Sequence, residues 1–352
     1  MRSRWGFALV IAAWATGCSG GASPAGGAGG AGGAGGSSDG AGGVPQGEKP
    51  RQEPPSNVVG GFSVELPSVT LAPGDETYPC WIAPLELMGT SHVVGGGRVT
   101  VTKGMHHGNV TARPKTGEGF RECPPESSPI GGEAEDIVAG GAVLFGSTTQ
   151  VEGTEYRTFP DGMGFPIDDG WEIVFRMHYL NPTSEALTLA PSYEWFTIDE
   201  STVTELLGPF IWRYVGFEIP PHAEKTVSAD CTLPAATHIV DMMPHMHKLG
   251  THFFGAVLGG PNDGDLFIDS PGYNPDGVIR SYDPALDLSD ANGFSFGCTW
   301  NNTLDKTIVE GVGDNEMCML FGYAYPYEAS YSVLASEGGA CIVLTLPPRD
   351  GG

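Results

Sequence analysis

Positive charge is scarce in this chain: 17 Lys and Arg residues stand against 42 Asp and Glu residues, and the formal net charge is −25. A surface of that sign repels nucleic-acid phosphates and anionic lipid head groups, so neither is an expected partner. The apolar run near the N-terminus is shorter than the roughly 20 residues that a bilayer-spanning helix needs. We therefore expect a soluble, exported protein, and the charge leaves its substrate open.

Long segments with helical periodicity are also missing. The chain has no repeat of 20–50 residues, the period that is typical of solenoids and propellers. It consists instead of short β-rich runs separated by Gly, Pro, Asn and Asp, such as FSVELPSVTL, GRVTVTKG, EIVFRMHY and CIVLTLPP. Over roughly 290 residues this pattern predicts an all-β protein made of two tandem jelly-roll-like β-sandwiches. We place them at residues 58–205 and 206–350.

The N-terminus has the form of an export signal over residues 1–17, with two arginines before the apolar stretch WGFALVIAAWATG. The stretch ends in ATGC, which resembles the lipobox of bacterial lipoproteins, with Ala15 in place of the usual Leu and Cys18 as the acylated residue. The alternative is an ordinary cleavage site beside an unrelated cysteine. Residues 18–57 then form a Gly/Ser-rich tether. We expect attachment to the bacterial cell envelope through lipid alone, facing the periplasm or the cell surface.

Six further cysteines lie in the body of the chain, and none forms a CxxC pair, which argues against a zinc ribbon. An even number of cysteines in an exported chain favours disulfides over buried thiols. Six cysteines allow fifteen connectivities, and spacing alone does not choose among them. Domain organisation favours pairing Cys80 with Cys123 in the first half.

Five of the nine histidines fall into three groups: GMHHGNV with His106 and His107, IVFRMHYLNP with His178, and PHMHKLG with His245 and His247. Alternate side chains of a strand share one face, so the last pair can meet one metal ion. Adjacent histidines can do so only at a bulge or a strand end, which the flanking glycines permit. A solvated strand face and a zinc site are the alternatives.

The ordered motifs MHH, VFRMHYLNP, HMHKLG and EMC resemble the copper type II, ascorbate-dependent monooxygenases. That family includes the peptidylglycine alpha-hydroxylating and dopamine beta-monooxygenases, and the similarity runs from DETYPCW to CIVL. It implies one copper site in each β-domain, facing each other across a cleft, with O2 and ascorbate or another one-electron reductant as co-substrates. The implied ligands of the electron-transfer copper are His106, His107 and His178. Those of the catalytic, oxygen-activating copper are His245, His247 and Met317.

The resemblance also implies a complete disulfide set, Cys80–Cys123, Cys231–Cys341 and Cys298–Cys318. A thioether is a soft ligand that favours Cu(I), whereas zinc has no redox chemistry and little use for it. Met317 is therefore the residue that favours copper over zinc, although on its own it reads as a buried core methionine.

Four positions depart from the peptide-amidating members of the family. Met243 replaces the Arg that binds the substrate carboxylate, while Met319 and Phe321 replace an Asn and a Tyr after the methionine ligand. Arg176 replaces a Gln two residues before the third histidine. Three of the four changes remove polarity, so we expect an apolar pocket and poor activity on peptides.

The sequence thus predicts a lipid-anchored, two-copper monooxygenase that hydroxylates a C–H bond of an apolar or aromatic small molecule. The alternative is a surface lipoprotein that binds and buffers copper without turnover, and a structural zinc protein is a third reading.

Overall fold

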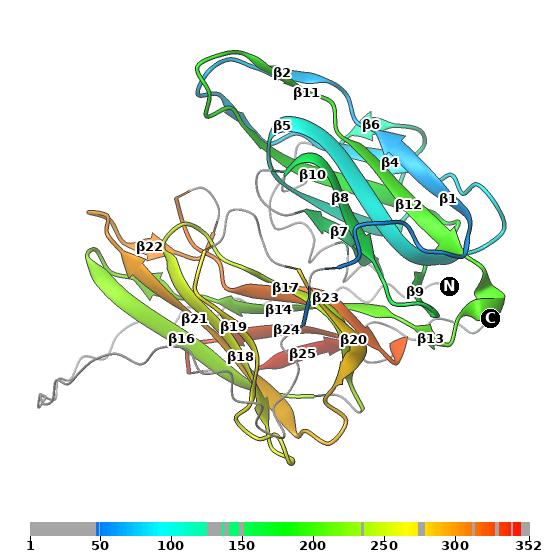
Figure 1. The fold of residues 1–352 in the computed structure, drawn as a ribbon. Helices are drawn as coiled ribbons and strands as arrows, with labels where there is room; N and C mark the ends of the chain where they lie inside the picture. The colour runs from blue at the N-terminus through cyan, green and yellow to red at the C-terminus, as the bar shows by residue number, and fades with distance from the viewer. Residues whose placement is uncertain are drawn as a thin grey trace, which may run out of the picture. The chain divides into compact units, whose positions relative to one another are not determined.

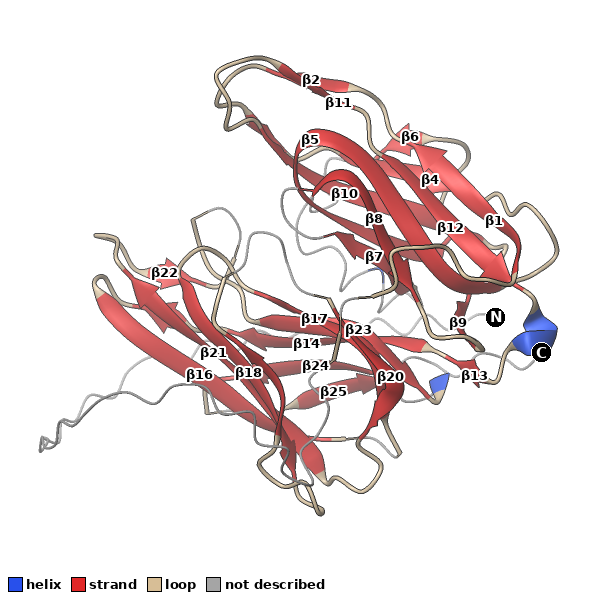
Figure 2. Ribbon diagram, viewed as in Figure 1, coloured by secondary structure: helices blue, strands red, loops and turns tan. Residues whose placement is uncertain are grey.

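The computed structural model describes residues 47–48, 50–124, 136, 141–147, 151–233, 236–273, 279–311, 314–327, 331–338 and 341–345. The predicted signal peptide, Cys18 and the tether as far as residue 46 lie outside these residues. Within the described chain, strands joined by loops make up almost all of the structure (Figure 2). None of its helices is long and apolar enough to cross a membrane. The all-β prediction is confirmed.

The N-terminal domain holds the first thirteen strands (Figure 1). They are β1 (Val58–Glu65), β2 (Val69–Leu71), β3 (Glu76–Thr77), β4 (Cys80–Pro84), β5 (Val93–Pro114), β6 (Arg121–Glu122), β7 (Ala142–Ser147), β8 (Val151–Thr158), β9 (Met163–Pro166), β10 (Trp171–Leu180), β11 (Leu187–Leu189), β12 (Ser192–Ile198) and β13 (Glu205–Leu206). The main path of the sheet is β1-β12-β5-β10-β4-β6, and β2 pairs with β11.

Strand β5 is the central element of this domain. Its first half pairs with β12, β8 and β9, and its second half pairs with β10 and β7. The strand changes partners around Gly104, whose φ of 107° suits glycine. One strand therefore contributes to two parts of the sheet, which together enclose a core that includes Phe62, Trp195 and Tyr193.

The C-terminal domain holds the other twelve strands. They are β14 (Gly208–Val215), β15 (Glu218–Ile219), β16 (Ala223–Thr232), β17 (His238–His245), β18 (Gly250–Leu258), β19 (Leu266–Ser270), β20 (Arg280–Asp287), β21 (Gly293–Asn302), β22 (Ile308–Val309), β23 (Met319–Tyr325), β24 (Tyr331–Ser336) and β25 (Ile342–Thr345). A six-stranded sheet, β20-β17-β23-β14-β24-β25, packs on a four-stranded sheet, β16-β21-β18-β19. Trp212 of the first stacks on Phe294 of the second with ring centroids 3.5 Å apart.

A buried ion pair joins the two domains. Arg157 of β8 donates twice to Asp241 of β17, at 2.6 and 2.7 Å, and both residues are 2% exposed. The Arg157 guanidinium also lies 4.6 Å from the ring centroid of Tyr323. The Tyr323 hydroxyl donates to the Val143 carbonyl of β7. β13 still pairs with β9, whereas β14 pairs with β23 and β24, so the chain passes from one sheet to the other between Leu206 and Gly208.

The segment just before β1 is already part of this body. Glu48 forms a two-way backbone bridge with Ser281 of β20, and Arg51 bridges to Thr158 of β8. The Arg51 guanidinium donates to the Phe159 carbonyl at 2.7 Å. The sequence placed the end of the tether at residue 57, and the structure orders part of it. The boundary rested on glycine content, which falls after Gly47. From Glu48 onward, backbone hydrogen bonds to β20 and β8 hold the chain against the folded body.

Three disulfides are present: Cys80–Cys123, Cys231–Cys341 and Cys298–Cys318. This is the set implied by the family resemblance, so that prediction is confirmed. Disulfides of this kind are typical of an oxidising compartment.

Candidate metal centres

The second histidine pair lies where β17 runs beside β23. Three cross-strand pairs follow one another along these two strands: Asp241 with Tyr323, Met243 with Phe321, and His245 with Met319. Residues two apart in a strand share a face. Asp241, which contacts the other domain, the apolar Met243 and His245 therefore lie in one row along β17. Successive pairs in such a row are about 7 Å apart along the strand.

His245 ends β17, and His247 lies in the turn that follows it. The prediction that both histidines share a strand face therefore differs from the structure, although their rings do meet, with centroids 5.2 Å apart and planes at 86°. A metal–imidazole bond of about 2.0–2.1 Å puts each centroid about 3 Å from the ion, so two ligands at a tetrahedral angle have centroids about 5 Å apart. The pair fits one metal ion.

The segment that carries Met317 fixes the orientation of His247. The Nδ1–H of His247 donates to the Asn315 carbonyl at 2.7 Å, so Nε2 is the nitrogen that this tautomer presents to a metal. Burial lowers the pKa of His247, and the charges of His178 and Lys248 lower it further, against the hydrogen bond to Asn315. The neutral imidazole is the form that binds a metal. Met317 follows two residues after Asn315 and is 9% exposed.

Glu316 holds the histidine turn and the methionine segment together. Its carboxylate accepts hydrogen bonds from the backbone N–H of His247 at 2.9 Å and of Leu249 at 2.8 Å, and from Nε1 of Trp300 at 2.9 Å. The side chain is fully buried, and burial raises the pKa of Glu316 to about 7, against the hydrogen bonds from these donors. Sequence reasoning missed this residue, although the E of the EMC motif marked it.

A disulfide braces the same segment from the core side. Cys318, next to Met317, is bonded to Cys298 of β21, two residues before Trp300. The Trp300 ring stacks on Phe217 with centroids 4.4 Å apart. Disulfide, indole and carboxylate together hold the segment that carries Met317 beside the histidine turn.

An apolar cluster borders this centre. Met243, Phe321 and Ile279 are each less than 9% exposed and pack together, with Ile211 against them, apart from the two main cores. The Phe321 ring centroid lies 6.5 Å from that of His245. The predicted pocket residues Met243 and Phe321 therefore lie together, and Met319 is directly opposite His245.

The first histidine group lies at a bulge between β5 and β10. His107 is opposite His178 and Met105 is opposite Tyr179, so His106 is the extra residue on β5. The sequence required such a bulge for adjacent histidines to serve one metal, and the backbone has it. The side chains of His106 and His107 lie outside the described part of the structure.

His178 is 8% exposed and has two neighbours that sequence reasoning missed. Its Nε2 lies 2.6 Å from Oε1 of Glu76, and its ring stacks on Tyr78 with centroids 4.3 Å apart. Burial lowers the pKa of His178, and the Glu76 carboxylate opposes that change. Both neighbours come from DETYPC, which is far from His178 in sequence, and no role for Glu76 or Tyr78 was predicted.

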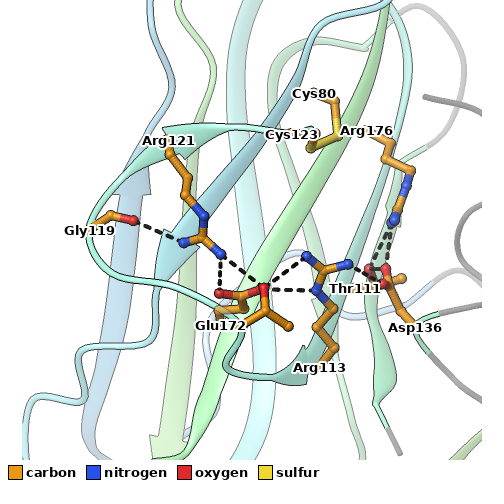
Figure 3. A network of polar contacts seen from close by, with 10 residues as sticks. Cys80, Thr111, Arg113, Gly119, Arg121, Cys123, Asp136, Glu172 and Arg176 are labelled. Carbon is orange, nitrogen blue, oxygen red and sulfur yellow. Dashed lines mark hydrogen bonds and ion pairs between the residues drawn. A yellow bond between two sulfur atoms is a disulfide. The ribbon is translucent and has the colours of Figure 1, made fainter. Parts of the chain in front are cut away.

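A buried ionic network continues along the same face of β10 (Figure 3). Arg176, two residues before His178, donates to Asp136 at 2.6 Å, and Asp136 also accepts from Arg113 at 3.1 Å. Arg113 and Arg121 both donate to Glu172, at 3.0 and 2.5 Å. The network ties β5, β6 and β10 together beneath the histidines.

The remaining four histidines are each paired with an aspartate away from these centres: His92 with Asp169, His222 with Asp305, His238 with Asp287 and His252 with Asp269. In the part of the chain that is described, no three His, Cys, Asp or Glu side chains gather as a metal site. At the second histidine pair, the two rings meet each other, and the segment that carries Met317 contacts His247 through Asn315 and Glu316.

No protein-family profile and no curated protein sequence matches this chain. Among solved structures, the chain is similar to the STIV MCP, with a TM-score of 0.33 and 9% identity over 76% of this chain and 97% of that chain. It is also similar to the major capsid protein P2 from bacteriophage PM2, with a TM-score of 0.31 and 8% identity over 75% and 97% of the two chains. These likenesses are slight, and no functional argument is built on them.

Proposed function

We propose that this protein is a copper-dependent monooxygenase that uses O2 and a reductant such as ascorbate to hydroxylate a C–H bond of an apolar or aromatic small molecule. The observation that carries the proposal is the second centre, where His245 and His247 meet at a metal-binding distance beside the segment that holds Met317. Two imidazoles and a thioether suit Cu(I). Zinc would gain little from the thioether.

Copper bound at the two centres would supply the two electrons of the hydroxylation, one from each ion. The chain prepares the second centre for this role. The hydrogen bond to Asn315 selects the Nε2 donor of His247, burial keeps that ring neutral, and Glu316 fixes the turn.

The substrate class follows from the apolar cluster beside His245. Met243 and Phe321 present no hydrogen-bond donor to a carboxylate, and Ile279 packs with them. An apolar surface excludes water and holds a hydrocarbon or aromatic group by burial of its area. The proposed substrate therefore offers an apolar C–H bond rather than a peptide carboxylate.

We also propose that the protein is a lipoprotein held to the bacterial cell envelope through Cys18. The lipobox-like ATGC motif supports this, and the three disulfides support export to an oxidising compartment.

Oxygen uptake tests the proposed activity. The copper-loaded chain is incubated with ascorbate and a panel of aromatic and aliphatic compounds, and incorporation of oxygen from ¹⁸O2 is read by mass spectrometry. We expect a hydroxylated product with the wild type and with His222→Ala, a surface control, and none with His247→Ala. Copper retained by the wild type and by His222→Ala without any oxygen uptake would contradict the enzyme and leave a copper-storage protein.

A further inference from the structure

The short strand β3 presents an acid and a phenol to the buried His178. Strand β3 pairs with the end of β10, with Glu76 opposite Leu180 and Thr77 opposite Tyr179. Continuing this antiparallel register places Tyr78 opposite His178, in agreement with the stacked rings. The sequence DETY therefore puts Glu76 at the edge of the His178 ring and Tyr78 on the face of that ring.

One carboxylate oxygen receives both contacts. Oε1 of Glu76 lies 2.6 Å from Nε2 of His178 and 2.6 Å from the hydroxyl of Tyr78. An ionised carboxylate only accepts hydrogen bonds, so the Tyr78 hydroxyl is the donor in this contact. With the Tyr78 proton directed to Oε1, the carboxylate is held in place while its charge faces the imidazole.

A neutral histidine carries one ring proton, and the group that accepts it decides which nitrogen is the metal donor. A carboxylate at Nε2 selects the Nε2–H tautomer, whose lone pair is on Nδ1. A carboxylate that accepts a hydrogen bond from a metal-binding imidazole also makes that imidazole a stronger donor to the metal.

We propose that Glu76 is a positioning residue of the first copper centre, which holds His178 as the Nε2–H tautomer with Nδ1 toward the metal, while Tyr78 locks the carboxylate and the ring plane. The copper part of this proposal rests on the proposed function. The tautomer part does not, because it concerns the protein without metal.

The carboxylate also adjusts the electron donor. Negative charge on an imidazole ligand stabilises Cu(II) more than Cu(I), because the ion of higher charge gains more from a stronger donor. A lower reduction potential at this centre makes its electron easier to pass on, which is the role assigned to the first copper.

The first experiment uses the metal-free full chain. Long-range ¹⁵N–¹H correlation of the histidine rings assigns the His178 tautomer in the wild type, Glu76→Gln, Tyr78→Phe and Glu86→Gln, a control at an exposed glutamate of the same domain. We expect a single Nε2–H form in the wild type and in Glu86→Gln, and a mixture in Glu76→Gln. A mixture in the wild type, or an unchanged single form in both Glu76→Gln and Tyr78→Phe, would overturn the proposal.

The second experiment uses the same proteins in a His247→Ala background, so that only the first centre binds copper. Loss of a partner of a metal-bound histidine costs about 10–100-fold in affinity, and we expect Glu76→Gln to lose Cu(II) affinity in that range in a chelator competition. A tenfold loss for Cu(II) with Cu(I) affinity unchanged raises the potential by about 59 mV. Tyr78→Phe, which keeps the ring but removes the hydroxyl, should shift the potential in the same direction by less.

The outcomes separate the two proposals. If the wild type shows a single Nε2–H tautomer but binds no copper at this centre, the copper function is contradicted and the Glu76–His178 pair still stands. Wild-type copper binding with unchanged affinity and potential in Glu76→Gln contradicts the role of Glu76 and leaves the monooxygenase standing. Thermal unfolding of each metal-free variant identifies a folding defect, and Tyr78→Phe then provides the decisive comparison.

Discussion

At the scale of the residue, the two histidine centres differ in the group that orients the imidazole. A backbone carbonyl accepts the Nδ1 proton of His247, and a carboxylate contacts Nε2 of His178. A neutral acceptor beside a methionine segment suits an ion held as Cu(I), whereas a carboxylate favours Cu(II). In the proposed copper enzyme, the two centres would thus serve different halves of one redox reaction.

Glu316 provides the first residue-scale prediction. Glu316→Gln keeps the size of the side chain but places an amide NH2 among three N–H donors. A buried donor left unsatisfied costs about 1–3 kcal/mol, so we expect a loss of at least that size in urea unfolding, together with weaker copper binding at the second centre. Glu337→Gln, which breaks only an exposed ion pair, should cost less than about 1 kcal/mol. Equal stability of the two variants would contradict the bracing role of Glu316.

Met243 provides the second prediction at this scale. Met243→Arg places an unpaired cation in a cluster that is almost fully buried, and an uncompensated buried charge is strongly unfavourable. We expect slower turnover of apolar substrates and lower stability, and we expect the wild type to act poorly on glycine-extended peptides because Met243 donates no hydrogen bond to a carboxylate. Efficient amidation of such a peptide by the wild type, assayed with copper and ascorbate, would contradict the pocket and leave the copper ligands in place.

At the scale of the element, buried ionic groups link the strands of the N-terminal domain. The Arg113–Glu172–Arg121 contacts tie β5, β10 and β6 on the face that continues to His178 (Figure 3). Glu172 is fully buried. Burial alone opposes its ionisation, but hydrogen bonds from Arg121, Thr116 and Arg113 outweigh that effect and hold the pKa of Glu172 below its ordinary value.

This shift gives a pH prediction with a definite sign. A carboxyl whose folded-state pKa is lowered stabilises the fold above its unfolded pKa, near 4.5, and loses that contribution as the pH falls through the folded pKa. Glu172→Gln removes a charge shared by the half-buried Arg113 and Arg121, of which Arg113 keeps Asp136, and should cost about 1–3 kcal/mol at pH 7. The difference between wild type and variant in urea unfolding should narrow below pH 4.5. A difference that stays constant from pH 7 to pH 3 would contradict the assignment.

The strands were largely predictable from the sequence, whereas the residues that contact the proposed ligands were not. Alternation and turn residues predicted the β-runs, and the motif order named His178, His245 and Met317. Glu76 lies 102 residues from His178, and only the β3–β10 register brings them together, which no local pattern encodes. Likewise, the sequence extended the strand through His247, whereas Glu316 draws the backbone of that residue into a turn.

At the scale of the whole molecule, the two domains share a buried ion pair in the row that leads to His245. Arg157 and Asp241 come from different domains, and Asp241 is two residues from Met243. The pair therefore connects the N-terminal domain to the strand that carries the apolar cluster and the second centre.

A double-mutant cycle tests this connection. Arg157→Met or Asp241→Leu alone leaves a buried charge unpaired and should cost about 3–5 kcal/mol, whereas the double variant should cost less than the sum of the two. The half-exposed pair Arg98–Glu194 is the control, with an expected effect of about 0–1 kcal/mol. Additive costs in urea unfolding would mean that the pair does not act as a unit.

The copper content of the full chain tests the central claim most directly. The wild type, His178→Ala and His247→Ala are loaded with copper, desalted and measured by elemental analysis against protein concentration. The account predicts two coppers per wild-type chain and one in each variant, because each substitution removes a ligand of a separate centre. A single copper in the wild type, zinc retained in place of copper, or loss of both ions from one substitution would contradict it.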